Sequence, residues 1–142
     1  MFTGYLMTHS KDVRAVCIAS GPPLNYKGIW YEKLAPSHEM LVKYANGMSW
    51  DNYVIAYQKI LKQLDAAEVV SEICNLTGLE VEGEMSPILL DWGNSNQVEC
   101  LRHIAANWLK AELGYKVVEL HKNAEVIFDY KRYPKKILQG ML

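Results

Sequence analysis

Three residue types that carry chemistry lie close together at the start of one predicted helix: Cys100, Arg102 and His103. A helix N-terminus stabilises anions and lowers the pKa of a nearby thiol, which makes Cys100 a candidate nucleophile. Arg102 is suited to pairing with a phosphate or carboxylate, and His103 is a candidate general acid or base. The alternatives stay open: Cys100 packs in the core, Arg102 is solvated, and His103 is a hydrogen-bonded packing residue.

The segment before this helix is a predicted strand that ends on a carboxylate, Asp91. Asp91 is a candidate to orient His103 or to accept a hydrogen bond from a ligand. It is equally suited to capping backbone N–H groups in the turn that follows. Cys100, His103 and Asp91 therefore form the candidate catalytic set.

Two predicted loops carry aromatic rings beside polar or basic residues. Such rings can stack on a nucleobase while a cation contacts a phosphate, although they can equally cover the core. The candidate ligand-binding residues in these loops and in the following helix are Arg102, Trp92, Asn94, Ser20, Gly21, Tyr26, Lys27, Trp30 and Tyr31.

Periodicity and capping residues predict the elements that position these side chains. Short apolar segments predict strands over residues 3–7, 14–19, 87–91, 115–120 and 126–128. Ser37, Ser49 and Asp65 are predicted to cap three successive helices. A fourth helix is predicted from a capping box at Asn96 to about Leu113. Three aromatic residues at helical spacing are predicted to be core residues, namely Trp50, Tyr53 and Tyr57.

Strand, helix and strand over residues 87–120 form a βαβ unit, which favours a parallel sheet. We therefore expect a single α/β domain over residues 1–130, with a mostly parallel central sheet flanked by helices in three layers. Residues 131–142 are a basic tail. Ligands of such sheets bind at the carboxyl ends of the strands, which is where Asp91 and both aromatic loops are expected.

Composition narrows the function classes. The chain has 142 residues, a hydrophobic share of 50 %, a charged share of 22 % and a formal net charge of -1. This balance is that of a globular protein without the overall basic field of a nucleic-acid binder. No apolar run approaches the ~20 residues that a membrane helix needs, so no membrane partner is expected.

Cysteine and histidine usage predicts the compartment and argues against a metal site. The three cysteines lack close pairing, which favours a reducing, cytoplasmic setting. The four histidines are scattered, and no C-x-x-C or H-E-x-x-H motif occurs, so no metal is expected. Phosphate-loop and dinucleotide motifs are also missing, and we expect no cofactor.

An ordered set of motifs resembles the domain-of-unknown-function 488 family over roughly residues 3–120. That family typically reads S-I-A-R-G-x-P, K-G, Y-x-x-L-A-P, a G-x-(I)-S-W turn, L-L-C-W-E and C-H-R-H-L-V-A-E-W-L. The corresponding segments here are residues 17–23, 27–28, 31–37, 46–50, 89–93 and 100–109. The resemblance implies a small α/β domain.

The departures from the family pattern concern its reactive groups. Asp91 replaces the first cysteine, Gly93 the following glutamate and Leu101 the first histidine, while Ser20 replaces an arginine. The resemblance therefore implies that a two-thiol redox or metal site is lost here, whereas an anion pocket around Arg102 and His103 is kept.

These observations lead to one preferred function and two alternatives. We expect a domain that binds or sequesters a small anionic, nucleotide-like ligand at the strand ends. One alternative is an enzyme that depends on Cys100 and His103 and acts on a small phosphorylated or nucleotide substrate. The other is a nucleic-acid or protein interaction domain that uses the basic tail. The aromatic residues are also consistent with a homodimer.

Overall fold

The computed structural model describes residues 1–93 and 100–120, together with the backbone of 124–125. One sheet runs through the described chain in the order β3-β2-β4-β1-β5-β6. The first five strands are parallel to their neighbours, and β6 is antiparallel to β5. The strands are β1 (Phe2–Tyr5), β2 (Ala15–Cys17), β3 (Ile29–Trp30), β4 (Ile88–Asp91), β5 (Val118–Glu119) and β6 (Ala124–Glu125). The predicted α/β class and mostly parallel sheet are confirmed.

The described strands differ from the predictions in their bounds, and one of them was not predicted. The first strand ends at Tyr5, because Leu6 already begins a short helix. The predicted strand over 115–120 forms its ladder only at Val118–Glu119. The two-residue β3 was missed because it follows a loop rich in glycine and proline and contains only two apolar residues. The strand predicted over 126–128 lies outside the described residues.

Five helices surround the sheet: α1 (Leu6–His9), α2 (His38–Ala45), α3 (Trp50–Lys62), α4 (Ala66–Thr77) and α5 (Leu101–Leu113), besides a 3-10 turn at Glu32–Leu34. The three predicted caps are confirmed, since the side chains of Ser37, Ser49 and Asp65 each accept a backbone N–H three residues on. None of the described helices is long and apolar enough to cross a membrane.

The start of α5 corrects a prediction. Cys100 has φ −142° and ψ 151°, so it is the extended N-cap residue and the helix begins at Leu101. The capping box predicted at Asn96 lies outside the described residues. The α5 N-terminus is satisfied from another element, because Asp91 Oδ2 accepts the backbone N–H of Arg102 at 2.9 Å. A carboxylate on β4 thus caps this helix, and no local pattern around residue 100 signals that contact.

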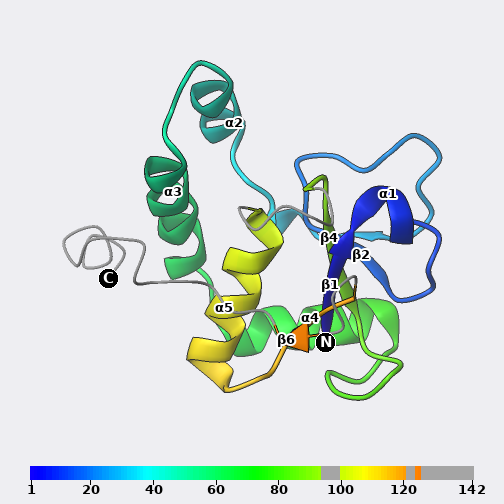
Figure 1. Cartoon of the computed structure of the whole chain (residues 1–142). Helices are drawn as coiled ribbons and strands as arrows, with labels where there is room; N and C mark the ends of the chain where they lie inside the picture. The colour runs from blue at the N-terminus through cyan, green and yellow to red at the C-terminus, as the bar shows by residue number, and fades with distance from the viewer. Residues whose placement is uncertain (94–99, 121–123, 126–142) are drawn as a thin grey trace.

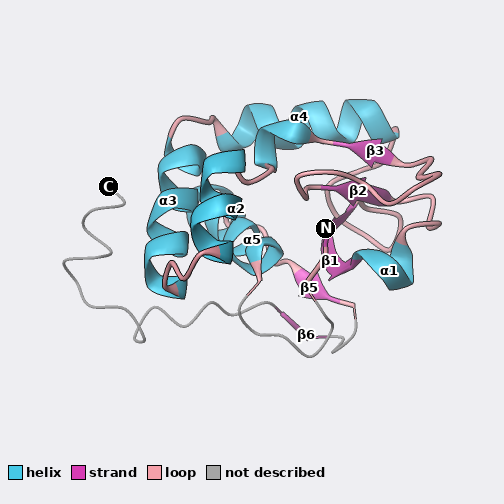
Figure 2. Cartoon of the chain, turned by 90° about the horizontal axis from the view of Figure 1, so that it is seen from above, coloured by secondary structure: helices cyan, strands magenta, loops and turns pink. Residues whose placement is uncertain are grey.

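The helices form two unequal layers around the sheet (Figures 1 and 2). Alternate strand residues such as Val16 and Leu89 pack with α2–α5 in one large apolar cluster. Their neighbours Cys17 and Leu90 pack in a smaller cluster with Leu6 of α1 on the opposite face. Figure 2 shows α1 across the sheet from α2, α3 and α5. Helices on both faces give the expected three-layer arrangement.

Parallel pairing brings several strand ends to the same edge of the sheet. Tyr5 of β1 is in register with Asp91 of β4, and Cys17 of β2 is in register with Leu90. Thr3 of β1 is in register with Glu119 of β5. Thr3 and Asp91 share the face of Leu89, so both project toward the helical layer that contains α5.

Candidate functional site

A buried ion cluster lies where α5 crosses the strand ends. The side chain of Arg102 is completely buried, and its Nη1 lies 2.5 Å from Asp91 Oδ1. Its Nε and Nη2 donate to Glu119 Oε2 and Oε1 at 3.0 and 3.2 Å. Nη1 also donates to the carbonyl oxygen of Gly93 at 2.6 Å. This fork of planar donors matches the bidentate geometry for which arginine is suited.

The position of Arg102 differs from the ligand-facing one expected from sequence. Its charge is directed to Asp91 and Glu119 inside the protein, so it presents no exposed guanidinium to an anion. Pairing the buried guanidinium with two carboxylates offsets the free-energy cost of burying each charge. The helix start suggested anion binding, and the protein's own carboxylates fill that role.

Glu119 is the member of this ion cluster that sequence reasoning missed. Its carboxylate accepts hydrogen bonds from Thr3 Oγ1 at 2.6 Å and from Arg102, and its Oε2 lies 2.9 Å from His103 Nε2. Burial acts to raise the pKa of Glu119, but the hydrogen bonds from His103, Arg102 and Thr3 outweigh it and lower this pKa to about 2. Glu119 is therefore ionised at neutral pH. One signal was present, since a carboxylate inside a short apolar strand requires a buried partner.

Cys100, His103 and Glu119 form a continuous chain of polar contacts. Cys100 Sγ lies 3.2 Å from His103 Nδ1, and His103 Nε2 lies 2.9 Å from the Glu119 carboxylate. All three residues are buried. Burial, followed by the nearby Asp91 carboxylate, raises the pKa of the Cys100 thiol to about 12. The structure thus joins two of the three predicted catalytic residues.

Asp91 has one of the roles predicted for it, but it does not orient His103. Its two oxygens accept the backbone N–H groups of Arg102 and Gly93 and the guanidinium of Arg102. It caps local backbone, which was one of its two predicted roles, and it does not contact His103. Glu119 takes the position beside the imidazole because β5, two strands away from β4, lies under the first turn of α5.

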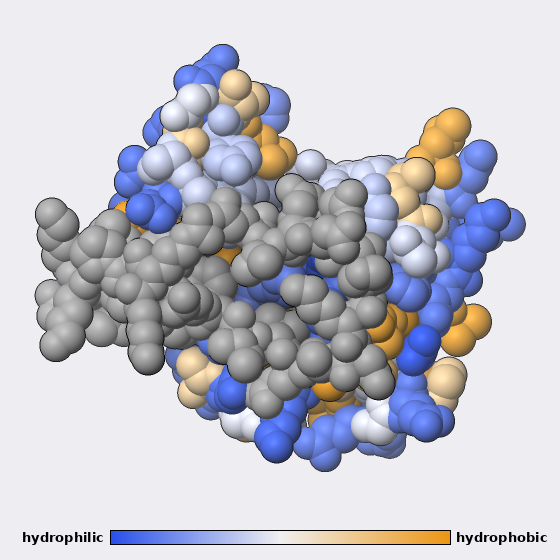
Figure 3. Space-filling view, in the orientation of Figure 1, coloured by the Kyte–Doolittle hydropathy of each residue, from blue (hydrophilic) through white to orange (hydrophobic). Residues whose placement is uncertain are grey.

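A cavity of about 290 Å³ lies beside this cluster. Its walls come from the strand ends, from α2 and α3 and from the start of α5. Figure 3 shows a notch in the molecular outline between the α2–α3 pair and the strand ends. The polar lining residues are Ser20, Asp91 and Cys100. We call this cavity the aromatic pocket, after the rings of Tyr44, Trp50, Tyr53 and Trp92 that line it.

Three of these rings pack together on one wall. Trp50 and Tyr53 are stacked with centroids 5.2 Å apart, and Tyr44 lies 4.8 Å from Tyr53. Tyr53 is buried as predicted, whereas Trp50 is half-buried and lines the pocket. These rings were assigned to the core or not considered, because their spacing shows a helix face but not what that face meets.

Trp92 borders the pocket from the loop after β4. Its indole is 45 % exposed, and its Nε1 donates to the carbonyl oxygen of Gly21 at 3.1 Å. Trp30 makes a matching contact, with Nε1 donating to the carbonyl oxygen of Ala19 at 3.0 Å. Two indoles therefore hold the loop after β2, but only Trp92 is among the described pocket residues.

The other predicted ligand residues lie elsewhere. Tyr26 and Lys27 line a separate cavity of about 750 Å³ next to α1, on the opposite face of the sheet. Tyr31 is buried and donates its hydroxyl to Glu72 of α4 at 2.9 Å. Asn94 lies outside the described residues. Of the predicted set, the structure brings Ser20 and Trp92 together at one pocket.

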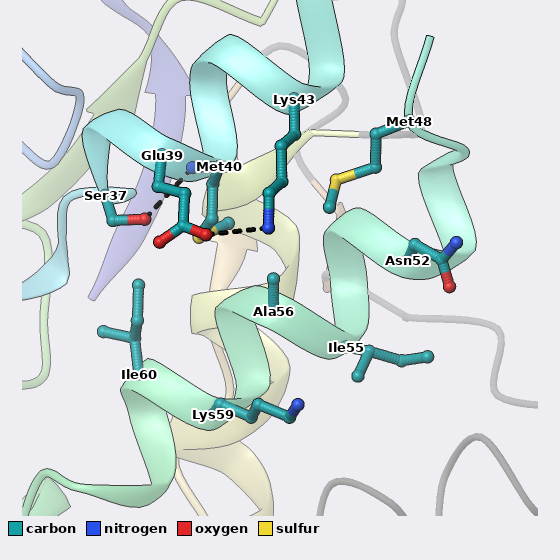
Figure 4. A pocket seen from close by; sticks show the side chains of 10 residues that line it. All are labelled: Ser37, Glu39, Met40, Lys43, Met48, Asn52, Ile55, Ala56, Lys59 and Ile60. Atoms are coloured by element: carbon teal, nitrogen blue, oxygen red, sulfur yellow. Dashed lines mark hydrogen bonds and ion pairs between the residues drawn. The ribbon is translucent and has the colours of Figure 1, made fainter. Parts of the chain in front are cut away.

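A third cavity, of about 480 Å³, lies between α2 and α3 (Figure 4). Two lysines line it, Lys43 and Lys59, and Lys43 is paired with Glu39 at 2.7 Å. The lining also includes apolar side chains such as Met40 and Ala56. The described residues around it include no cysteine or histidine. The aromatic pocket therefore remains the candidate functional site, because it is the cavity in contact with Cys100 and the buried ion cluster.

Within residues 1–93 and 100–120, no group of three or more His, Cys, Asp or Glu side chains is placed to hold a metal ion. Comparison with protein-family models, curated proteins and solved structures finds no match. The geometry of the pocket itself is therefore the basis for inferring a function.

Proposed function

We propose that the protein binds a small ligand with a planar ring in the aromatic pocket. The observation that carries this proposal is the joint placement of Trp92, the Tyr44–Trp50–Tyr53 cluster and the Asp91 carboxylate around one cavity at the strand ends. Aromatic rings bind flat ligands by stacking, worth about 1–3 kcal/mol for each nucleobase. Ligands of parallel α/β sheets bind at this edge.

The charge of the lining argues for an uncharged ring, because the Asp91 carboxylate is already paired with the buried guanidinium of Arg102. The described lining includes Asp91 and no lysine, arginine or histidine. Residues 94–99, which follow Trp92 in the chain, also include no basic residue in their sequence. The proposal therefore keeps the nucleobase-like ring of the sequence-based expectation and omits the phosphate. Asp91 and Ser20 are the polar groups available to orient ring nitrogens.

The size of the cavity restricts the ligand further. Ligand pockets typically enclose ~300–1,000 Å³, and this one, at about 290 Å³, lies at the lower end. One ring system fills it, so a nucleobase or nucleoside is a better match than a dinucleotide. The half-exposed position of Trp92 leaves one side of a bound ring open to solvent.

Tryptophan fluorescence tests the proposal with a matched pair of variants. Nucleobases, nucleosides and nucleoside monophosphates are titrated into the wild-type protein and into Trp92→Ala and Trp30→Ala. Both indoles hold the same loop and have similar exposure, 45 % and 40 %, but Trp30 does not line the pocket. We expect Trp92→Ala to weaken binding about tenfold or more, and Trp30→Ala to leave it within about twofold.

Two results would contradict the proposal. One is that none of the ring compounds binds the wild-type protein. The other is an equal loss of affinity in both tryptophan variants, which would mean that they act through the loop rather than by stacking. Tighter binding of monophosphates than of nucleosides would restore the anionic ligand expected from sequence.

A further inference from the structure

The chain of contacts from Cys100 through His103 to Glu119 has the connectivity of a nucleophile, a proton acceptor and an orienting carboxylate. The three residues come from the N-cap of α5, its first turn and β5. Cys100 also lines the aromatic pocket. The chain of contacts from Glu119 to Cys100 therefore ends at the cavity where a ligand is proposed to bind.

The hydrogen bonds around Glu119 define the proton positions on His103. Glu119 is ionised, so it accepts the Nε2–H of His103. In the tautomer that carries its proton on Nε2, the unprotonated nitrogen is Nδ1, which faces Cys100 Sγ at 3.2 Å. Thr3 Oγ1 and Arg102 Nε donate to the same oxygen, Oε2, and so hold the carboxylate in place. The imidazole is thereby oriented to accept the thiol proton.

The other cysteines of the chain lack this arrangement. In the described part of the structure, neither Cys17 nor Cys74 has a hydrogen bond to an imidazole. Cys17 lies under α1 in the smaller apolar cluster, and Cys74 is half-buried on α4. Cys74 is the more accessible thiol, which makes it an internal control for simple exposure.

We propose that Cys100 is the nucleophile of an acyl-transfer site, with His103 as general base and Glu119 as its positioning residue. This inference rests on the proposed function in one respect, since the acyl donor enters the same aromatic pocket. A substrate with a planar aromatic leaving group or acyl group fits its rings. The thiol is protonated at rest, so attack and proton transfer to Nδ1 occur together.

The reaction balances without a further cofactor. Cys100 Sγ forms a bond to the carbonyl carbon of an ester or amide, and the thiol proton moves to His103 Nδ1. The bond from the carbonyl carbon to the leaving oxygen or nitrogen breaks, and the leaving group takes the proton from Nδ1. Water, again deprotonated by His103, then cleaves the thioester and returns the Cys100 thiol with release of a carboxylic acid.

The test uses the full chain and p-nitrophenyl acetate, an activated ester with a planar leaving group. Release of p-nitrophenolate is followed by absorbance, and the acetyl group is located on Cys17, Cys74 or Cys100 by peptide mass spectrometry. We expect Cys100 to be acetylated at least about tenfold faster than Cys74, despite its burial. His103→Gln is expected to slow this reaction at least about tenfold, and Cys74→Ser to leave it unchanged.

Acetylation of Cys74 before Cys100, or no acetyl group on Cys100 together with p-nitrophenolate release no faster than that of Cys100→Ser, overturns the inference. An unchanged Cys100 rate in a folded His103→Gln variant also overturns it. The comparison of cysteines within the wild-type protein decides the question even if that variant does not fold. Ring binding by the wild-type protein separates the two proposals, because a failure of the thiol chemistry alone leaves that binding intact, whereas ring binding is absent if the pocket proposal fails.

Discussion

His103 Nε2 lies 2.9 Å from Glu119 Oε2, although the two residues are 16 positions apart in the sequence and belong to α5 and β5. The contact exists because β5 pairs with β1 and so lies beneath the first turn of α5. It links the candidate nucleophile Cys100 to the buried ion cluster. The stability of this edge of the sheet and the reactivity that we propose for Cys100 therefore depend on the same carboxylate.

Replacing Arg102 is expected to destabilise the protein strongly. Arg102→Met leaves Asp91 and Glu119 buried without their cation, and breaking a buried ion pair costs about 3–5 kcal/mol. Denaturant unfolding measures this loss. Arg14→Met is the control, because Arg14 pairs with Asp12 near the surface and its loss should cost far less. Equal losses in both variants would show that the buried cluster adds no special stability.

The decrease in the free energy of unfolding at acid pH should depend on Glu119. Its pKa falls from the ordinary 4.5 to about 2 in the folded protein, so ionised Glu119 stabilises the fold above pH 4.5. This contribution, on the order of 3 kcal/mol, is lost as the pH falls from about 4.5 to 2. Denaturant unfolding between pH 2 and 7 should show Glu119→Gln less stable than wild type at neutral pH, with the difference shrinking in acid.

The exposed residue Glu39 is the matched control for this experiment. Its carboxylate pairs with Lys43 on the surface of α2, so Glu39→Gln should follow the wild-type curve closely. If the free energy of unfolding of Glu119→Gln decreases at acid pH as much as that of wild type, the low pKa of Glu119 is wrong.

Gly93 is expected to tolerate no side chain. A Cβ at this position would lie 2.6 Å from Cys100 Cβ and 3.0 Å from Arg102 Nη1. Gly93→Ala should therefore displace the nucleophile or the guanidinium, at a cost of about 1–3 kcal/mol, and weaken ring binding. Gly21→Ala, in the loop across the pocket, meets nothing within 4 Å and should change stability by less than about 0.5 kcal/mol. Thermal unfolding and the fluorescence titration measure both.

The hydroxyl of Tyr57 should contribute to the core beneath the pocket. It is buried and donates to the carbonyl oxygen of Leu34 at 2.7 Å. Tyr57→Phe removes this donor and leaves a buried acceptor, which should cost about 1–3 kcal/mol of unfolding free energy. Tyr44→Phe, at a half-exposed ring, is expected to have little effect. An unchanged free energy of unfolding in Tyr57→Phe would mean that water replaces the lost donor.

Local patterns predicted the helices because their signals lie within a few residues. Ser49 caps α3 with its own side chain, and Gly114 ends α5 in the left-handed conformation with φ 75°. These features depend on contacts between neighbours in the chain, so the sequence displays them directly. The same local reasoning placed the start of α5 too early, because its cap comes from Asp91 on another element.

The sequence predicted where the candidate site lies but not which of its residues contact one another. The βαβ pattern correctly placed Asp91, Trp92 and Cys100 at one edge of the sheet, since parallel strands end together. Arg102 was expected to face a ligand, and Glu119 was not considered. A charged residue at a helix start has the same local signal whether its partner is a ligand or a carboxylate of the protein.

The sequence by itself determined the α/β class, the capped helices and the edge of the sheet at which chemistry is possible. Only the tertiary structure decided that Arg102 is buried between Asp91 and Glu119, that Glu119 rather than Asp91 orients His103, and that Tyr44, Trp50 and Tyr53 form a pocket wall. The physical reason is how far apart in the sequence the contacting residues lie. Caps and turns arise between residues three or four apart, whereas ion clusters and pockets arise from the register of strands and the packing of helices far apart in the chain.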